Sequence, residues 1–138
     1  MLLVNARCGP SVIHGLGLIA KEFIPAGQPV WVVRRGFDVI LTEADFIELS
    51  SPAKQQVCNY AYFCLVQRVF VLSSDDDRFT NHSEQPNIQF EAGTAVAIRD
   101  ILTGEEITGD YRELGWTQLL GVPSASAVHG PKCIGVVL

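Results

Sequence analysis

One short stretch of the sequence gathers side chains that can bind a ligand. Residues 78–87 read Arg-Phe-Thr-Asn-His-Ser-Glu-Gln-Pro-Asn, so an amide, an imidazole and a hydroxyl follow one another at Asn81, His82 and Ser83. The proline that follows this triplet stiffens the return of the chain. A hydrophilic loop between two strands has the same composition, so the stretch alone fits either a binding site or a plain loop.

Two further clusters carry the same ambiguity. Gly15 and Gly17 flank Leu16 directly after a histidine, and paired glycines allow a backbone to approach a ligand closely. The third glycine of a dinucleotide-binding loop is absent, so a plain turn is the alternative. Residues 104–111 read Gly-Glu-Glu-Ile-Thr-Gly-Asp-Tyr, and Tyr111 can either place a phenol in a pocket or pack in the core.

The sequence predicts no metal site. His82 has no second histidine or cysteine at ligand spacing, and the three aspartates at 75–77 lack the distal glutamate of a calcium loop. The four cysteines form no Cys-x-x-Cys pair, so their spacing does not indicate zinc.

Short apolar segments separated by glycine and proline turns must hold these clusters in place. β-Branched and aromatic residues predict strands, and the run Pro-Val-Trp-Val-Val is the clearest of them. The expected strand segments are 13–20, 29–33, 37–41, 69–72, 87–91, 94–99 and 107–111. Several short strands with frequent turns predict a compact domain that is mainly β.

The middle of the chain has a different pattern. Thr42 followed by Asp45 is typical of a helix start, and Ser51 before Pro52 is typical of a second one. Apolar residues then recur at helical spacing. The pattern therefore predicts a helical insert over residues 42–66 within a strand-rich chain.

Length and charge narrow the classes of function. The chain has 138 residues, which fits one domain, and its 15 acidic residues outnumber its 10 basic residues. The resulting net charge of −5 argues against general nucleic-acid binding and suits a basic partner. No apolar run approaches the roughly 18 residues of a membrane span, and residues 1–4 are too few for a signal-peptide core. We therefore expect an intracellular protein without membrane contact, in the cytoplasm or, in a eukaryote, in the nucleus.

The three clusters, taken together and in this order, resemble the SET-domain protein lysine methyltransferases. The resemblance rests on Gly-x-Gly at 15–17, Arg-Phe-x-Asn-His-Ser-x-x-Pro-Asn at 78–87 and Gly-Glu-Glu-Ile-Thr-x-Asp-Tyr at 104–111, and residues 97–101 also fit. It implies a SET domain over residues 1–116 that includes the insert 42–66, followed by a short tail, 117–138. The implied fold is β-rich and β-clip-like, with a knot-like crossing near its C-terminal end.

The resemblance also implies S-adenosylmethionine as the cofactor and a lysine side chain of a protein as the methyl acceptor. The backbone of residues 15–17 would contact the methionine part of the cofactor. Asn81 would hold its amino-acid end, and the backbone of His82 would pair with the adenine edge. Tyr111 would lie beside the sulfonium methyl as the catalytic phenol, and Trp116 would stack on the adenine ring.

The methyl acceptor in such a reaction must be a neutral amine. Free lysine has a pKa of about 10.4, so removing its proton at pH 7 costs roughly 4.6 kcal/mol. An apolar channel beside the cationic sulfonium lowers that pKa by desolvation and like-charge repulsion. The implied site therefore needs aromatic walls and few acids.

Tyr60 and Tyr62 are the candidates for a second wall of this lysine channel. Two residues apart on a helix, they would point about 200° from each other, so only one could face the channel. We assign that role to Tyr62 as a second catalytic residue. Packing of both tyrosines in the core is the alternative.

The tail departs from the family pattern. Its single cysteine, Cys133, cannot form the zinc cluster that completes the substrate channel in many SET enzymes. The sequence therefore predicts a minimal SET domain acting on a lysine-containing protein or peptide, histone-like or ribosomal, with small amines as a further substrate class. A non-catalytic SET-like module that binds basic peptides is the alternative function. Neither the number of methyl groups transferred nor the oligomeric state follows from the residues.

Overall fold

The computed structural model describes residues 1–64 and 67–114. In chain order the elements are β1 (Ala6–Pro10), β2 (Leu16–Ala20), β3 (Pro29–Val32), β4 (Val39–Thr42), α1 (Glu43–Glu48), α2 (Ser51–Tyr60), β5 (Tyr62–Cys64), β6 (Val69–Leu72), the 3₁₀ turn η1 (Asp76–Phe79), β7 (Asn81–His82), β8 (Ile88–Glu91), β9 (Thr94–Ala97), β10 (Glu106–Gly109) and the 3₁₀ turn η2 (Tyr111–Leu114). Within these ranges, no helix combines the length and the apolar character needed to cross a membrane.

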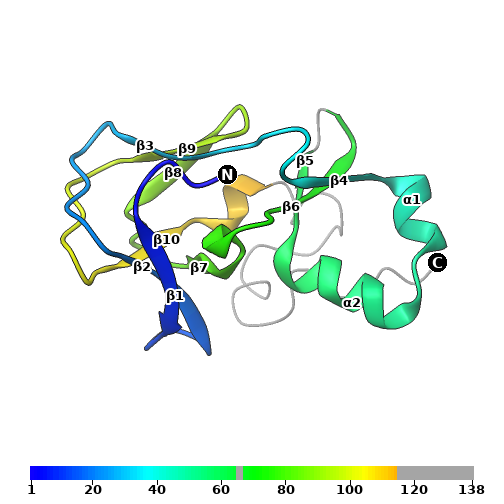
Figure 1. The fold of residues 1–138 in the computed structure, drawn as a ribbon, viewed down its shortest axis with the longest axis horizontal. Coiled ribbons are helices and arrows are strands. Elements are labelled where there is room, and N and C mark those ends of the chain that lie inside the picture. Colours follow the sequence, from blue (N-terminus) through cyan, green and yellow to red (C-terminus); the bar gives the residue numbers. More distant parts are fainter. Residues whose placement is uncertain (65–66, 115–138) are drawn as a thin grey trace.

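The strands form three small sheets, which confirms the mainly β fold class. The strand orders are β1-β2-β10-β7 in the first sheet, β3-β9-β8 in the second and β4-β6-β5 in the third. Figure 1 shows β1 and β2 in the left half of the molecule, α1 and α2 at the right end, and the sheet of β4, β6 and β5 between them. The insert thus lies apart from the hairpin that carries the Gly-x-Gly motif.

Two apolar clusters hold the sheets together. The larger cluster joins the fully buried Leu18 and Ile107 of the first sheet to Trp31 and Ile88 of the second. The smaller cluster joins Phe46 of α1 to Phe70 of β6, whose rings stack with their centres 4.5 Å apart. Burial of one such side chain contributes about 1.5–3 kcal/mol to folding. The two clusters therefore fix the sheets and the insert as one framework around the polar motifs.

The helix starts of the insert follow the expected capping chemistry with one shift. At α1 the Thr42 hydroxyl accepts a hydrogen bond from the Asp45 amide at 3.1 Å, and the Asp45 carboxylate accepts one from the Thr42 amide at 2.8 Å. This reciprocal pair is a capping box. At α2 the capping hydroxyl belongs to Ser50 rather than to the expected Ser51. Either serine can cap a helix, and the chain takes the earlier one.

The expected helical insert over 42–66 is wrong at its C-terminal end. The helix α2 ends at Tyr60, and Ala61 is already in the extended region. Tyr62 and Phe63 then pair with β6, and the Phe63 ring packs against Phe70 with centres 4.9 Å apart. Strand pairing and aromatic burial outweigh the weak preference for helix that the spacing carried.

The most consequential pairing in the fold is the parallel pair of β7 and β10. It sets Thr108 beside Asn81 and Gly109 beside His82. The buried Asn87 side chain supports the pair, because its carbonyl accepts the Thr108 amide at 2.8 Å and its amide donates to the Glu106 carbonyl at 2.8 Å. The residues of the second and third sequence motifs therefore lie side by side.

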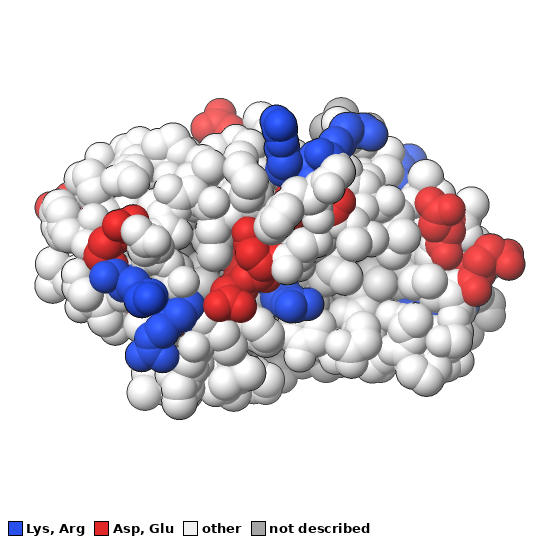
Figure 2. All heavy atoms as spheres, viewed as in Figure 1, with Lys and Arg blue, Asp and Glu red and all other residues white. Residues whose placement is uncertain are grey.

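One face of the molecule carries charged side chains of both signs. On the face shown in Figure 2, basic and acidic groups lie in separate small patches among uncharged surface.

Candidate functional site

The side chain of Asn81 lies in a cluster of oxygen atoms. From β7, its amide nitrogen reaches the Glu106 carboxylate at 2.8 Å, the Leu16 carbonyl at 2.9 Å, the Ser11 hydroxyl at 3.1 Å and the His14 carbonyl at 3.2 Å. An amide nitrogen carries only two hydrogens, so these four oxygens exceed what it can satisfy. The cluster therefore has spare acceptor capacity for a group with several N–H donors.

Glycines shape the backbone around this cluster. Gly17 lies in β2, and a side chain there would overlap with the Glu106 carboxylate. Gly15 has a φ of +51°, in the left-handed region, and no atom lies near the position of a side chain. Glycine thus allows the hairpin to turn and lets Glu106 lie directly against the strand. The backbone of residues 15–17 contributes to the cluster through the Leu16 carbonyl.

A pocket with aromatic walls lies beside Thr80, the residue directly before β7. Its lining includes five aromatic side chains, which are Trp31, Tyr60, Tyr62, Phe90 and Tyr111. The remaining lining residues are Ser73, Asp77, Arg78 and Thr80. Trp31 and Tyr62 meet edge to face, with ring centres 5.7 Å apart. The pocket is thus largely apolar, with a few polar groups in one part of its wall.

Tyr111 is held at two points in this pocket. Its hydroxyl donates a hydrogen bond to the Thr80 carbonyl at 2.8 Å, and its backbone amide donates to His82 Nδ1 at 3.2 Å. Burial raises the pKa of Tyr111 well above its usual value, with a further contribution from the charge of Asp77. The phenol is therefore protonated and oriented at neutral pH.

Both candidate channel tyrosines reach the pocket, which corrects the expectation that only one could. The expectation assumed a continuous helix, but Tyr60 is the last residue of α2 and Tyr62 is the first residue of β5. The change of backbone between them removes the 200° separation. Burial also raises the pKa of Tyr62, with smaller effects from the neighbouring Cys64 and Asp77.

Asp77 is a pocket residue that the sequence analysis missed. It is 9% exposed, and its carboxylate accepts hydrogen bonds from the Ser73 hydroxyl at 2.9 Å and the Thr80 hydroxyl at 3.4 Å. Its neighbours Asp75 and Asp76 instead accept backbone amides of Leu2 and Cys8. Nothing in the run Asp-Asp-Asp distinguishes the three aspartates, so only the structure separates the pocket residue from the other two.

Two buried donors of the pocket wall have no acceptor. Among the residues that the structure describes, Trp31 Nε1 and Arg78 Nε have no hydrogen-bond partner. Unpaired buried donors are costly, so they favour a guest that brings an acceptor or water. In the same part of the chain, no group of three or more His, Cys, Asp or Glu side chains is placed to bind a metal ion.

The family of the chain follows from its sequence. Residues 15–112 match the family model of the SET domain. The chain belongs to the SET-domain family. This confirms the resemblance drawn from the three motifs, all of which lie within the matched range. No curated protein matches the chain.

Solved structures share the fold of this SET domain at low sequence identity. A candidate histone methyltransferase from Plasmodium falciparum is similar with a TM-score of 0.58 and 19% identity, covering 80% of this chain and 95% of that one. The Neurospora SET-domain protein DIM-5, a histone lysine methyltransferase, gives a TM-score of 0.55 and 20% identity over 80% of this chain and 53% of that one. A chain of the Polycomb Repressive Complex 2 from Chaetomium thermophilum gives 0.63 and 20% over 80% and 16%. This SET domain thus spans about half of the DIM-5 chain and a small part of the Polycomb chain.

The structure brings together most of the predicted site residues of this SET domain. The paired strands β7 and β10 bring together residues 15–17, Asn81, His82 and Tyr111. Tyr62 lies in the aromatic pocket. Trp116 lies outside the described residues, as do the tail 117–138 and its cysteine. Their expected roles stay predictions.

Proposed function

We propose that this SET domain is a protein lysine N-methyltransferase that uses S-adenosylmethionine. The observation that carries the proposal is the arrangement of two unlike sites next to β7. An acceptor-rich cluster surrounds Asn81, and a protonated, partly buried phenol lies at Tyr111 in an aromatic pocket. One site suits a charged amino-acid group, and the other suits an alkyl amine chain.

The oxygen cluster fits the amino-acid end of the cofactor. An ammonium group brings three N–H donors, and the Leu16 and His14 carbonyls together with Asn81 offer oxygen acceptors. Glu106 adds a negative charge at the same place. The backbone of His82 would hold the adenine, and Trp116 would stack on it. When bound, S-adenosylmethionine supplies a methyl group on a positively charged sulfur atom, from which an amine can displace it.

The pocket residues would prepare the lysine amine for attack. The aromatic walls exclude water, which disfavours the charged ammonium and lowers its pKa. The Asp77 carboxylate has the opposite effect, but hydroxyl donors from Ser73 and Thr80 disperse its charge. Tyr111 cannot serve as a base at neutral pH, since its pKa is raised. Its fixed hydroxyl oxygen instead orients the groups that react, and orientation alone can contribute several kcal/mol.

A lysine in a basic peptide is the substrate that we propose. The chain carries a net charge of −5, which favours a positively charged partner. The Neurospora relative is a histone lysine methyltransferase, which supports histone-like tails as substrates to test. Lysine-rich segments of ribosomal proteins have the same chemistry and belong in the same screen.

One observation favours a second candidate function, a non-catalytic module that binds basic peptides. The buried Asp77 lines the pocket, and a carboxylate favours the ammonium form of lysine, which can bind but cannot attack a methyl group. In this case the pocket would recognise a lysine side chain without changing it.

The test is a calorimetric titration of cofactor-free protein with S-adenosylmethionine, followed by transfer of a labelled methyl group to a set of lysine peptides. We expect saturable one-to-one binding and labelling of a peptide that requires its lysine. The Tyr111→Phe variant should keep cofactor binding and lose most of the transfer. Binding of peptide and cofactor without any transfer would favour the non-catalytic module, and no cofactor binding by folded protein would overturn the proposal.

A further inference from the structure

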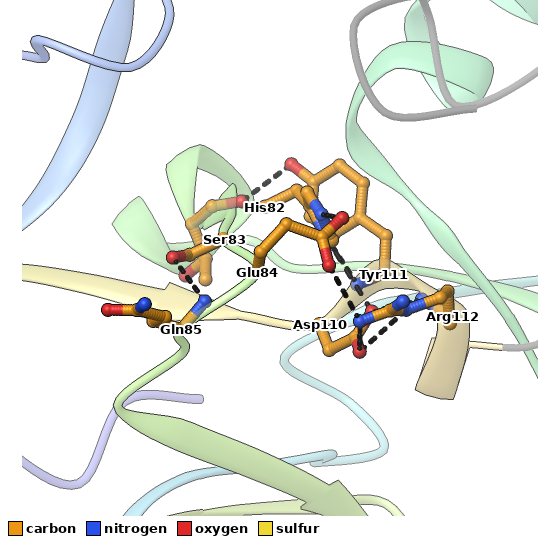
Figure 3. A network of polar contacts seen from close by, with 8 residues as sticks. His82, Ser83, Glu84, Gln85, Asp110, Tyr111 and Arg112 are labelled. Carbon is orange, nitrogen blue, oxygen red and sulfur yellow. Dashed lines mark hydrogen bonds and ion pairs between the residues drawn. The ribbon is translucent and has the colours of Figure 1, made fainter. Parts of the chain in front are cut away.

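A group of charged side chains closes around His82 where the loop after β7 meets η2. Arg112 lies between two carboxylates, with its Nη2 atom 3.1 Å from Glu84 and 2.6 Å from Asp110. Its Nε atom also donates to both Asp110 oxygens at 2.8 Å. Figure 3 shows Glu84, Asp110 and Arg112 around the imidazole, with Tyr111 next to it. Arg112 thus ties the loop after β7 to the residues that flank Tyr111.

The contacts of His82 define which of its nitrogens carries the proton. The Tyr111 backbone amide can only donate, so Nδ1, at 3.2 Å from it, must be the acceptor and carry no hydrogen. A neutral imidazole then has its proton on Nε2, which lies 3.2 Å from the Glu84 carboxylate. The side chain of His82 is 6% exposed, so the ring itself is largely shielded from bulk water, whereas its partner Glu84 is exposed.

Asp110 competes with Glu84 for this proton. Its Oδ1 atom lies 3.7 Å from Nδ1, on the side of the ring that must stay unprotonated. A proton on Nδ1 would face the Tyr111 amide hydrogen and break the hydrogen bond between the Tyr111 amide and Nδ1. Arg112 counters this attraction, because its hydrogen bonds engage both Asp110 oxygens and hold the pKa of that carboxyl below its usual range. Glu84 lies in a turn in which the Gln85 backbone amide donates a hydrogen bond to the Ser83 hydroxyl at 3.0 Å.

We propose that Glu84 and Arg112 are positioning residues for Tyr111, which they serve through the tautomer of His82. Glu84 accepts a hydrogen bond from the protonated Nε2 atom, and Arg112 keeps Asp110 from attracting a proton to Nδ1. The Nδ1 atom then accepts a hydrogen bond from the Tyr111 backbone amide, which fixes the start of η2. The catalytic consequence rests on the proposed function of Tyr111. The tautomer of His82 and the hydrogen bond from the Tyr111 amide do not rest on that function, so they can be tested in protein without substrate.

The first experiment is nitrogen NMR of the full chain with isotope-labelled histidine, and the signals of His82 are assigned by their loss in His82→Gln. We expect an Nε2-protonated ring in the wild type and in Glu84→Gln, which keeps an acceptor oxygen. Glu84→Ala and Arg112→Gln should shift the ring toward the Nδ1-protonated tautomer. Hydrogen exchange of the Tyr111 backbone amide should become about tenfold faster in Glu84→Ala and in Arg112→Gln. Glu43→Ala, which removes the exposed ion pair of Glu43 with Arg68, is the control and should change neither signal.

The second experiment measures methyl transfer by the same variants. Glu84→Ala should lower kcat about tenfold with little change in KM for the peptide, and Glu84→Gln should restore most of it. An unchanged His82 tautomer and Tyr111 amide exchange in both Glu84→Ala and Arg112→Gln would overturn the inference. A changed tautomer with unchanged kcat would overturn the positioning role and leave the proposed methyltransferase intact. An inactive wild type with the expected NMR shifts would instead count against the proposed function alone.

Discussion

Around Asn81 of β7, one amide nitrogen meets four oxygen atoms, whereas in the pocket of Tyr111 two buried nitrogen donors meet no acceptor among the described residues. The first region is built from directed hydrogen bonds, which fix one geometry for one ligand. The second is built mainly from aromatic surface, which selects by shape and by exclusion of water. This contrast agrees with the proposed function, in which the polar region binds one cofactor and the aromatic region admits a lysine side chain.

Asn81→Ala is the change that should break the polar region. The loss of one hydrogen-bonding side chain to a charged group costs about 1.5–3 kcal/mol, so S-adenosylmethionine should bind roughly 10- to 100-fold more weakly. Calorimetry measures this directly. Asn59→Ala removes a surface asparagine that bonds only to Gln55 among the described contacts, and it should bind the cofactor like the wild type. Equal affinity of the two variants would contradict the role of Asn81.

Gly17→Ala tests the packing of the polar region. The added methyl group overlaps with the Glu106 carboxylate, and such overpacking typically costs about 1–3 kcal/mol of stability. Chemical unfolding should show this loss, together with weaker cofactor binding. The double variant with Glu106→Ala removes the overlap, so its stability loss should be smaller than the sum of the two single losses. Strict additivity would show that the carboxylate does not constrain this glycine.

Asp77→Asn sharpens the contrast by removing the charge from the aromatic region. A carboxylate near the lysine favours the ammonium, so its loss should lower the pKa of the bound amine. The rising limb of the pH profile of kcat, which reports groups in the bound complex, should then move several tenths of a pH unit or more toward lower pH. Asp76→Asn, which removes a carboxylate that accepts the Cys8 amide, is the control and should leave the limb in place. A limb that moves equally in both variants would exclude a specific effect of Asp77.

The smallest expected effect concerns alkaline stability. Burial raises the pKa of Tyr62 in the folded protein, so the phenol holds its proton there above the pH at which it ionises in the unfolded chain, about 10. Stability is therefore complete below that pH and falls as the pH rises above it. Tyr62→Phe should reduce this fall by about 1.4 kcal/mol per pH unit at most. Urea unfolding at neutral and alkaline pH measures the difference, and an identical fall in both proteins would contradict the assignment.

The sequence predicted the parts of the fold that local chemistry determines. The capping pair of Thr42 and Asp45 marks the start of α1 as expected, and the apolar segments after Leu16 and Pro29 are strands. The three motifs also gave the family. By contrast, β5 depends on its pairing with β6, which is a contact between segments rather than a property of either.

The missed parts of the site have the same cause. Nothing in the sequence distinguishes Asp77 from Asp75. The family resemblance assigned His82 a backbone role, whereas the contacts of its side chain with Tyr111 and Asp110 come from another segment. The parallel pairing of β7 with β10 brings these groups together. Long-range pairing of this kind leaves no periodic pattern in the sequence.

The most direct test of the central claim is the mass of a lysine peptide after incubation with the protein and S-adenosylmethionine. We predict that the wild type adds methyl groups to the lysine side chain, that a peptide with arginine in its place gains none, and that Tyr111→Phe is slower by about a hundredfold. An unmodified peptide, in a sample that demonstrably binds both cofactor and peptide, would contradict the claim and identify a binding module.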